Sequence, residues 1–197
     1  MIKVVGITGG IGSGKTTLSK HLKKTGYSVH ESDEAVSDMY KKPSTNFISF
    51  LKKNISEEVF KKNRINKTQI SKIIFNNKKS KNKLEKYIHK EVRLSREKFI
   101  KKNTKAKKSI IFVDIPLLLE NKLEKNFDTV ISIISSKKNR TNRVLKDKKF
   151  TKAILKKIFN AQTTDKERRE RSQIIIYNNK TKKDFISDAN KALIHFL

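Results

Sequence analysis

Near the N-terminus stands the stretch Gly9-Gly10-Ile11-Gly12-Ser13-Gly14-Lys15-Thr16-Thr17, which fits the phosphate-binding pattern G-x-x-x-x-G-K-[ST]. The apolar residues 2–7 precede it and predict a buried strand, and apolar residues at helical spacing follow over 18–22. A glycine-rich loop between a strand and a helix lets backbone N–H groups converge on a phosphate, and the helix N-terminus adds partial positive charge. We therefore expect the chain to bind a nucleoside triphosphate. A turn with a chance Lys-Thr pair is the alternative, which the flanking elements disfavour.

The residues of this loop have expected parts in binding ATP. Glycines allow the backbone to approach the phosphates, where a Cβ would stand in the way. Lys15 is expected to reach the β- and γ-phosphates, and the Thr16 hydroxyl is expected to bind Mg²⁺. The predicted ATP contacts are Gly9, Gly10, Ile11, Gly12, Ser13, Gly14, Lys15, Thr16 and Thr17.

The length and composition of the chain restrict its class. With 197 residues it is one domain, or a core with insertions, and it can bury a substantial core. It contains no cysteine, which excludes disulfide and thiol chemistry and is compatible with a reducing cytoplasm. The apolar start is interrupted by Lys3 and is too short for a signal peptide, and no run approaches the length of a membrane span. We expect a soluble, cytoplasmic protein.

The formal net charge of +29 raises the alternative of a nucleic-acid-binding ATPase. Of the 48 basic residues, 40 are Lys and 8 are Arg, whereas base reading and phosphate forks favour Arg. The lysines are spread along the chain on polar helix faces and are not gathered in one arm. We therefore expect solvated, lysine-rich faces and no specific nucleic-acid partner, although such a surface attracts anions at low salt.

Further apolar runs after the loop each predict a strand. They cover residues 27–31, 109–115, 128–134 and 174–177, and helical periodicity separates them. Between residues 44 and 103 only helical signals occur, so no strand is expected there. A closing helix is expected around Phe185, Ala189 and Phe196. Near-continuous apolar strands separated by helices indicate an α/β fold of three layers, with a parallel sheet of about five strands covered by helices on both faces.

Functional groups are expected at the carboxyl ends of these strands, where open α/β sheets carry their sites. The first strand ends in the loop, the second leads to Asp33, and the third ends in Asp114. Asp33 can accept the proton of an attacking hydroxyl, or it can cap the helix that begins at Glu34. Asp114 can bind Mg²⁺ together with Thr16, directly or through water, or it can cap the turn at Pro116.

Arg140 and Arg143 lie three residues apart after the fourth strand, so one helical face carries both. Two arginines on a mobile helical lid can close over the phosphates and neutralise the charge that develops during transfer. A solvated helix face in a basic protein is the alternative. His89 lies on the long helix before the third strand, where a lone His more often packs or caps than reacts. A further basic cluster precedes the fifth strand and has no assigned role: Arg168, Arg169 and Arg171.

Taken together, these residues resemble the dephospho-CoA kinase family, a group within the P-loop kinases. The run from Thr8 to Lys15 is similar to the loop of that family and is far more specific than the general pattern. Asp33 resembles the second acid of the family's Asp-x-Asp, which implies the general base for the acceptor hydroxyl. Residues 115–120 resemble its Pro-Leu-Leu-Phe-Glu stretch, which implies substrate contacts at Pro116 and Leu117.

The resemblance continues toward the C-terminus. Arg140 and Arg143, followed by Ala161-Gln162, look like the lid segment of the family. Asn178, together with the next Asn, resembles its Asn-rich turn near the adenine. On the long helix, His89 stands where the family has a histidine, which implies a candidate acceptor contact.

What the resemblance implies is transfer of the ATP γ-phosphate to the ribose 3′-hydroxyl of dephospho-CoA, the last step of coenzyme A synthesis, with Mg²⁺ as cofactor. It implies a nucleotide-binding core of residues 1–32, 104–137 and 164–197, a helical acceptor domain of 33–103, and a lid of 138–163. A related kinase for another nucleoside or nucleotide is the alternative, and the base-like Asp33 favours a hydroxyl over a phosphate acceptor. We expect a monomer or a weak homo-oligomer.

The chain departs from the family's pattern in several places. Glu31 stands where the family usually has Asp, and Lys90 follows His89 in place of Pro. Asp147, next to a lysine, takes the place of a further lid arginine. Ser and Gln at 172–173 replace the usual Ala-Asp before the fifth strand.

Overall fold

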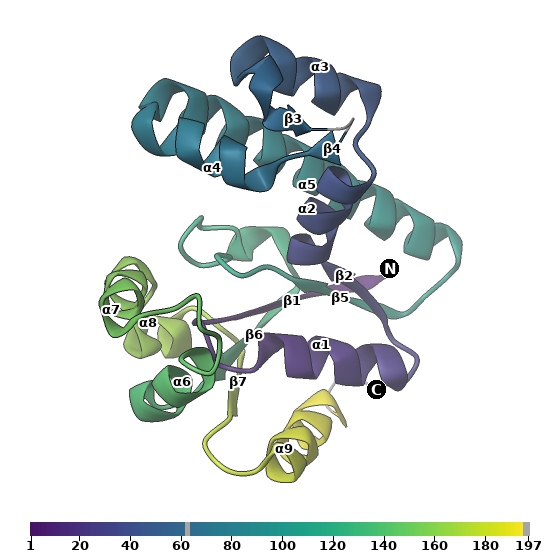
Figure 1. The fold of residues 1–197 in the computed structure, drawn as a ribbon. Coiled ribbons are helices and arrows are strands. Elements are labelled where there is room, and N and C mark those ends of the chain that lie inside the picture. The colour runs from purple at the N-terminus through teal and green to yellow at the C-terminus, as the bar shows by residue number, and fades with distance from the viewer. Residues whose placement is uncertain (62–63, 195–197) are drawn as a thin grey trace. The chain divides into compact units, whose positions relative to one another are not determined.

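The computed structural model describes residues 1–61 and 64–194. Its main sheet has the spatial order β2-β5-β1-β6-β7, and every neighbouring pair is parallel (Figure 1). The strands are β1 (Lys3–Gly9), β2 (Ser28–Glu31), β5 (Ile110–Asp114), β6 (Thr129–Ile134) and β7 (Ile174–Tyr177). The predicted five-stranded parallel sheet is confirmed. β1 is its central strand, and the glycine-rich loop follows the end of β1.

The strands are buried on both faces, as their near-continuous apolar sequences predict. Because successive side chains of a strand point to opposite faces, β5 contributes Phe112 to one hydrophobic cluster and Val113 to another. The first cluster also contains apolar residues of α1 (Lys15–Lys24) and α9 (Lys182–Ile194), which lie together on one side of the sheet (Figure 1). The second cluster is completed by the segment 115–127, which includes the short helix η2 (Glu124–Asn126). The helix predicted near the C-terminus is thus present as α9, and Phe196 lies outside the described residues.

Between β6 and β7 the chain forms α6 (Lys137–Val144), α7 (Lys152–Ala161) and α8 (Asp165–Glu170). Each of these helices begins after a hydroxyl side chain that accepts a hydrogen bond from the backbone N–H three residues further on. Such caps satisfy N–H groups that have no partner inside the helix, and so they fix where each helix begins. The capping residues are Ser136, Thr151 and Thr164.

The contacts of the chain divide it into two compact units, residues 1–31 with 100–197, and residues 32–99. The second unit is helical, and its small core includes the fully buried Phe47 and Leu51. Tyr87 stacks on Phe47 with ring centroids 5.4 Å apart. None of the helices within the described ranges is long and apolar enough to cross a lipid bilayer. The helices of the second unit are α2 (Ser32–Lys41), α3 (Thr45–Asn54), η1 (Glu57–Val59), α4 (Lys67–Asn76) and α5 (Lys78–Lys105). The last of these, α5, ends in the first unit.

The expectation that residues 44–103 contain no strand is wrong. Two short strands, β3 (Phe60–Lys61) and β4 (Arg64–Ile65), pair antiparallel in the helical unit, with Phe60 opposite Ile65. Strands of two residues are too short to show the apolar alternation by which a strand is recognised. Phe60 and Ile65 pack against the core of this unit, so the pairing depends on tertiary contacts that the local sequence does not reveal.

Candidate active site

The glycine-rich loop leaves β1 at Gly9 and joins α1 at Lys15. The Ser13 N–H donates to the Gly10 carbonyl over 3.0 Å and closes the turn. Gly14 has a φ of 113°, a left-handed conformation that favours glycine, and a Cβ there would collide with the carboxamide of Asn178. The Nζ of Lys15 donates to the Gly9 carbonyl over 3.2 Å, so the ammonium group lies across the loop.

A cavity of about 230 Å³ opens beside the loop. It is lined by residues 12–16 of the loop and by Arg143 and Val144 of α6. The loop contributes backbone N–H groups and the N-terminus of α1, and α6 contributes a cation. A concave surface of this charge is suited to a polyphosphate.

Asn178, directly after β7, supports the phosphate loop through hydrogen bonds. Its Nδ2 donates to the Ser13 carbonyl over 2.7 Å, and its own N–H donates to the Ile134 carbonyl over 2.8 Å. The carboxamide oxygen of Asn179 accepts from the Ser136 N–H over 2.7 Å. The two asparagines therefore connect the end of β7 with the loop and with the start of α6. The contact of Asn178 with adenine stays a prediction.

The two predicted lid arginines have different surroundings, and Arg143 is the more heavily bonded. Its Nη1 donates to the Gly12 carbonyl over 3.2 Å and to the Ser135 hydroxyl over 3.1 Å. Its Nη2 donates to the backbone and side-chain oxygens of Asn178 over 2.9 and 3.2 Å. Partial burial lowers the pKa of Arg143, but a guanidinium stays charged in proteins. Arg143 therefore ties α6 to the loop.

Arg140 lies against the loop and keeps donors unused. Its guanidinium covers Gly10 so closely that a Cβ on this glycine would collide with Nη1. The Arg140 Cζ lies 4.9 Å from the centroid of the Phe159 ring, and Nη2 lies 3.7 Å from the Asp165 carboxylate. In the part of the chain that the structure describes, its buried Nε has no hydrogen-bond partner. A nearly buried cation with spare donors beside a phosphate loop is suited to receive an anion.

The connector between α7 and α8 makes a loop contact that sequence reasoning missed. The Oε1 of Gln162 accepts a hydrogen bond from the Ile11 N–H over 3.0 Å. The next residue, Thr163, donates its N–H to Glu120 Oε1 over 2.9 Å, and its carbonyl accepts from Arg168. Arg168 is fully buried and pairs with Glu120 over 3.1 Å. Burial lowers the pKa of Arg168, and the attraction of Glu120 opposes that effect. This buried ion pair holds the connector in place.

Thr16 and Asp114 supply oxygen donors of the kind that Mg²⁺ prefers. Thr16 is exposed in the first turn of α1, and Asp114 ends β5 in register with Ile7 of β1. The hydroxyl of Ser19, one turn after Thr16, donates to Asp114 Oδ2 over 3.0 Å and fixes this carboxylate to α1. The described residues hold no cluster of three His, Cys, Asp or Glu side chains. Mg²⁺ on a nucleotide needs none, because phosphates and water supply most of its ligands, so the donor set fits.

The remaining predicted site residues divide between the two units. Asp33 lies in the first turn of α2 and His89 lies on α5, both with exposed side chains in the helical unit. Pro116 and Leu117 follow β5 in the other unit, where the Leu117 side chain is 44% exposed and that of Leu118 is buried. The side chains of Asp33, His89 and Leu117 are thus accessible to a ligand, and the roles of all four residues stay predictions.

Two departures from the family's pattern have partners within the core unit. Glu31 forms an ion pair with Lys23 of α1 over 2.6 Å. Ahead of β7, the hydroxyls of Ser172 and Ser132 lie 2.7 Å apart. The Oε1 of Gln173 accepts from the N–H at position 130 over 2.8 Å. The longer or more polar side chains at these positions therefore join elements of the core.

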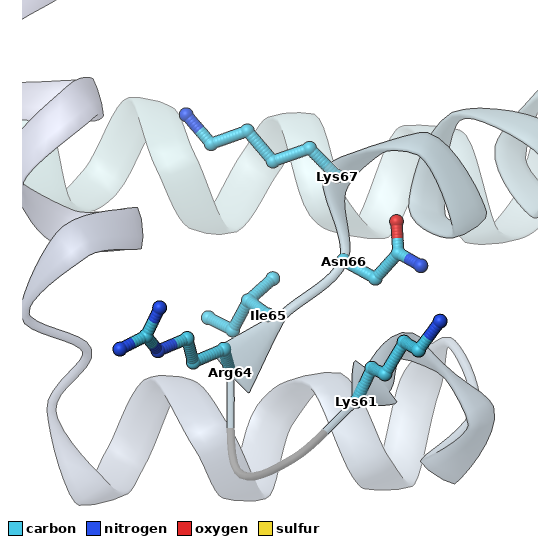
Figure 2. Close-up of a pocket in the computed structure, with 5 residues that line it drawn as sticks. All are labelled: Lys61, Arg64, Ile65, Asn66 and Lys67. Atoms are coloured by element: carbon cyan, nitrogen blue, oxygen red, sulfur yellow. The ribbon is translucent and has the colours of Figure 1, made fainter.

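A broad hollow of about 800 Å³ in the helical unit is lined by Lys61, Arg64, Ile65, Asn66 and Lys67. Figure 2 shows the charged ends of Lys61 and Arg64 pointing to opposite sides. The Nζ of Lys67 lies 4.5 Å from the centroid of the Tyr40 ring. Because these cations diverge, the hollow lacks the convergent donors that the loop provides.

A parallel sheet with a glycine-rich phosphate loop after its central strand, and with an arginine laid over that loop, is the arrangement of the P-loop class of nucleotide-binding proteins. Solved structures share this fold. A dephospho-CoA kinase from Campylobacter jejuni has a TM-score of 0.75 at 23% identity, with 99% of this chain and 97% of that chain covered. A shikimate kinase from Acinetobacter baumannii has a TM-score of 0.52 at 15% identity, with 99% and 94% covered.

The sequence comparisons narrow this class to one family. The family model described as dephospho-CoA kinase matches residues 3–184. The dephospho-CoA kinase of Fusobacterium nucleatum is 32% identical over 192 residues, which cover 96% of each chain. That of Bartonella quintana is 32% identical over 185 residues, which cover 91% of this chain and 90% of the relative. The chain belongs to the dephospho-CoA kinase family.

Proposed function

We propose that this protein transfers the γ-phosphoryl group of ATP to the ribose 3′-hydroxyl of dephospho-CoA, giving coenzyme A and ADP. The observation that carries the proposal is the family match over residues 3–184, which spans the loop, both lid arginines and Asn178. In the proposed reaction the bond between the γ-phosphorus and the ADP oxygen breaks. A bond from that phosphorus to the 3′-oxygen forms, and the hydroxyl proton leaves.

The core unit holds the donor in this proposal. The loop N–H groups and Lys15 bind the β- and γ-phosphates, and Arg140 neutralises the charge that develops on the transferred group. Arg140 suits this role better than Arg143, because the donors of Arg143 are already bonded to Gly12, Ser135 and Asn178. The proposed part of Arg143 is to hold the loop and to form a wall of the nucleotide cavity.

Mg²⁺ bound to ATP is the proposed cofactor, held by the Thr16 hydroxyl and by Asp114, directly or through water. When bound, it supplies positive charge to the phosphate oxygens. The chain contributes the placement of both donors, because the hydrogen bond from Ser19 keeps the Asp114 carboxylate beside α1.

In the proposal, residues 33–103 form the domain that binds the acceptor, and residues 138–163 form the lid. The nucleotide-binding core consists of residues 1–32, 104–137 and 164–197. Asp33 is the proposed general base, which takes the proton of the 3′-hydroxyl on its carboxylate. His89, Pro116 and Leu117 are the proposed acceptor contacts.

The test is an assay of ADP formation with ATP, Mg²⁺ and dephospho-CoA, run beside adenosine and nucleoside monophosphates. We expect dephospho-CoA to accelerate ADP formation and mass spectrometry to show one added phosphoryl group on it, with the other acceptors near background. No acceleration by dephospho-CoA would contradict the proposal. Acceleration by adenosine or a monophosphate in its place would identify a related kinase with a different acceptor.

A further inference from the structure

We infer that Gln162 is a positioning residue of the transfer site. Its side chain holds α7 at a fixed distance from the phosphate loop, and this placement of α7 keeps Arg140 where it can contact the transferred phosphoryl group. The inference rests on the proposed function, since it concerns the same transfer. Its starting observation is the hydrogen bond from the Ile11 N–H to Gln162 Oε1, 3.0 Å long and formed across 151 positions of the sequence.

Gln162 and Arg140 meet the loop at the same place. A Cβ built on Gly10 would lie 3.2 Å from Gln162 Oε1 and would collide with Arg140 Nη1. The two side chains therefore share the space over Gly10, where only a glycine leaves room for both. Phe159, whose ring lies under the Arg140 guanidinium, precedes Gln162 by less than one helical turn on α7. One helix end thus carries both the contact to the loop and the support of the arginine.

The connector that bears Gln162 is fixed from inside the core. Glu120, at the end of the segment after β5, accepts from the Thr163 N–H over 2.9 Å and from Arg168 over 3.1 Å. Because Arg168 is fully buried, its ion pair with Glu120 fixes the backbone at Thr163, and with it the position of the adjacent Gln162. A fixed backbone suits a positioning residue, because a displacement of a catalytic group by about 1 Å can lower the rate about a hundredfold.

The end of α7 does not depend on the side chain of Gln162. The backbone of Gln162 ends α7, and its N–H donates to the Ile158 carbonyl over 3.1 Å. The carboxamide contributes nothing to that cap and reaches away from the helix to the loop. Removing the carboxamide alone therefore leaves the helix end intact and deletes only the link between α7 and the loop.

The test uses Gln162→Ala in the full-length protein, with steady-state kinetics on ATP and dephospho-CoA. We expect kcat to fall about tenfold, the rate equivalent of one lost hydrogen bond, while the KM for ATP changes less than about threefold. Gln162→Met, which keeps the length and removes the acceptor, is expected to show the same loss. Asn160→Ala, at an exposed position of α7, is the matched control and is expected to keep wild-type kcat.

A double-mutant cycle with Arg140→Ala separates positioning from a general structural effect. We expect Gln162→Ala to cost about tenfold in kcat when Arg140 is present and almost nothing when Arg140 is absent. Equal losses in both backgrounds, an unchanged kcat, or a loss confined to the KM for ATP would each overturn the inference. A wild-type protein inactive on dephospho-CoA contradicts the proposed function and this inference with it. An active wild type with an equally active Gln162→Ala variant contradicts the inference alone.

Discussion

Arg143 and Asn178 are joined by two hydrogen bonds, from Nη2 to the backbone oxygen of Asn178 over 2.9 Å and to its side-chain oxygen over 3.2 Å. The Nδ2 of the same Asn178 donates to the Ser13 carbonyl over 2.7 Å. One buried carboxamide therefore connects α6, the end of β7 and the phosphate loop. The shape of the loop depends on groups that lie more than a hundred residues away in the sequence.

Asn178→Ala tests this dependence. The change leaves the Ser13 carbonyl and one Arg143 donor without their partner, and we expect the free energy of unfolding to fall by about 1–3 kcal/mol. We also expect weaker ATP binding, because the loop loses its support. Urea denaturation and ATP titration measure the two effects. Asn160→Ala is the control for an exposed asparagine, and a variant that matches this control in both measurements would contradict the assigned role.

Lys15→Ala tests the donor assignment. Lys15 makes one hydrogen bond to the Gly9 carbonyl, so its loss is expected to change stability little. We expect kcat/KM for ATP to fall by about 10²–10³, the effect of removing one charged donor from a phosphoryl-transfer site. Lys20→Ala, at an exposed position of the same helix, controls for the loss of a positive charge. Unchanged ATP affinity and rate in Lys15→Ala would mean that the loop does not bind the nucleotide.

The buried pair of Arg168 and Glu120 is expected to matter for stability. Arg168→Met leaves the Glu120 carboxylate without its buried partner, and we expect a loss of about 3–5 kcal/mol in the free energy of unfolding. Arg169→Met provides a matched control, because the adjacent Arg169 is exposed and its replacement is expected to change stability by less than about 0.5 kcal/mol. Urea unfolding of both variants decides the matter. Equal stabilities would show that the pair does not anchor the connector.

The parts of the fold that could be predicted from the sequence are those with a local signal. Each strand of the main sheet is a short apolar run, and the loop matches a defined sequence motif. Periodicity and residue type were therefore enough to predict the strands and the loop. Strand ends differ from the expectation by only one or two residues. The hairpin of β3 and β4 was not predictable, because strands of two residues show no period and are stabilised by the core of the helical unit.

Candidate site residues can be named from the sequence only where a residue type and its setting suggest a chemistry. Lys15 has such a setting in its motif, whereas Asp33 and Arg140 each left a structural alternative open, and the roles of all three stay predictions. The contact of Gln162 with Ile11 could not be predicted, because the resemblance of Ala161-Gln162 to the family's lid names no partner for the amide. The cluster at 168–171 had no assigned role for the same reason: nothing local shows that Arg168 is buried while Arg169 is exposed. Pairings over such distances depend on the completed fold.

The pair of Glu124 and Arg171 predicts a pH dependence of stability. Burial raises the pKa of the Glu124 carboxyl. Hydrogen bonds from Arg171, of which one is 2.6 Å long, together with a backbone hydrogen bond and the positive charges of Arg171 and Lys125, outweigh that effect and bring the pKa below its ordinary value of 4.5. Because the pKa is lower in the folded state, the stabilisation is complete above the unfolded value and is lost as pH falls through the folded value.

Glu124→Gln is therefore expected to lower the free energy of unfolding at about pH 7 by on the order of 1 kcal/mol, and to narrow its difference from wild type at about pH 3.5. Urea titrations at both pH values measure this. Glu170→Gln, an exposed acid of α8, is the control. A difference between Glu124→Gln and wild type that is equal at both pH values would show that this carboxylate does not contribute to the acid sensitivity of the fold.

Asp33→Asn separates the two roles open to this residue, general base and support of the helix start. Asp33 is exposed in the first turn of α2, where either Asp or Asn supports a helix N-terminus, so stability is expected to stay within about 0.5 kcal/mol. A carboxamide cannot take the proton of a hydroxyl, and kcat with dephospho-CoA is expected to fall by about 10²–10⁴ with little change in ATP affinity. Asp38→Asn, exposed on the same helix, is expected to retain most of the activity. Near-normal turnover of Asp33→Asn would assign the residue to the helix start and leave the base to another group.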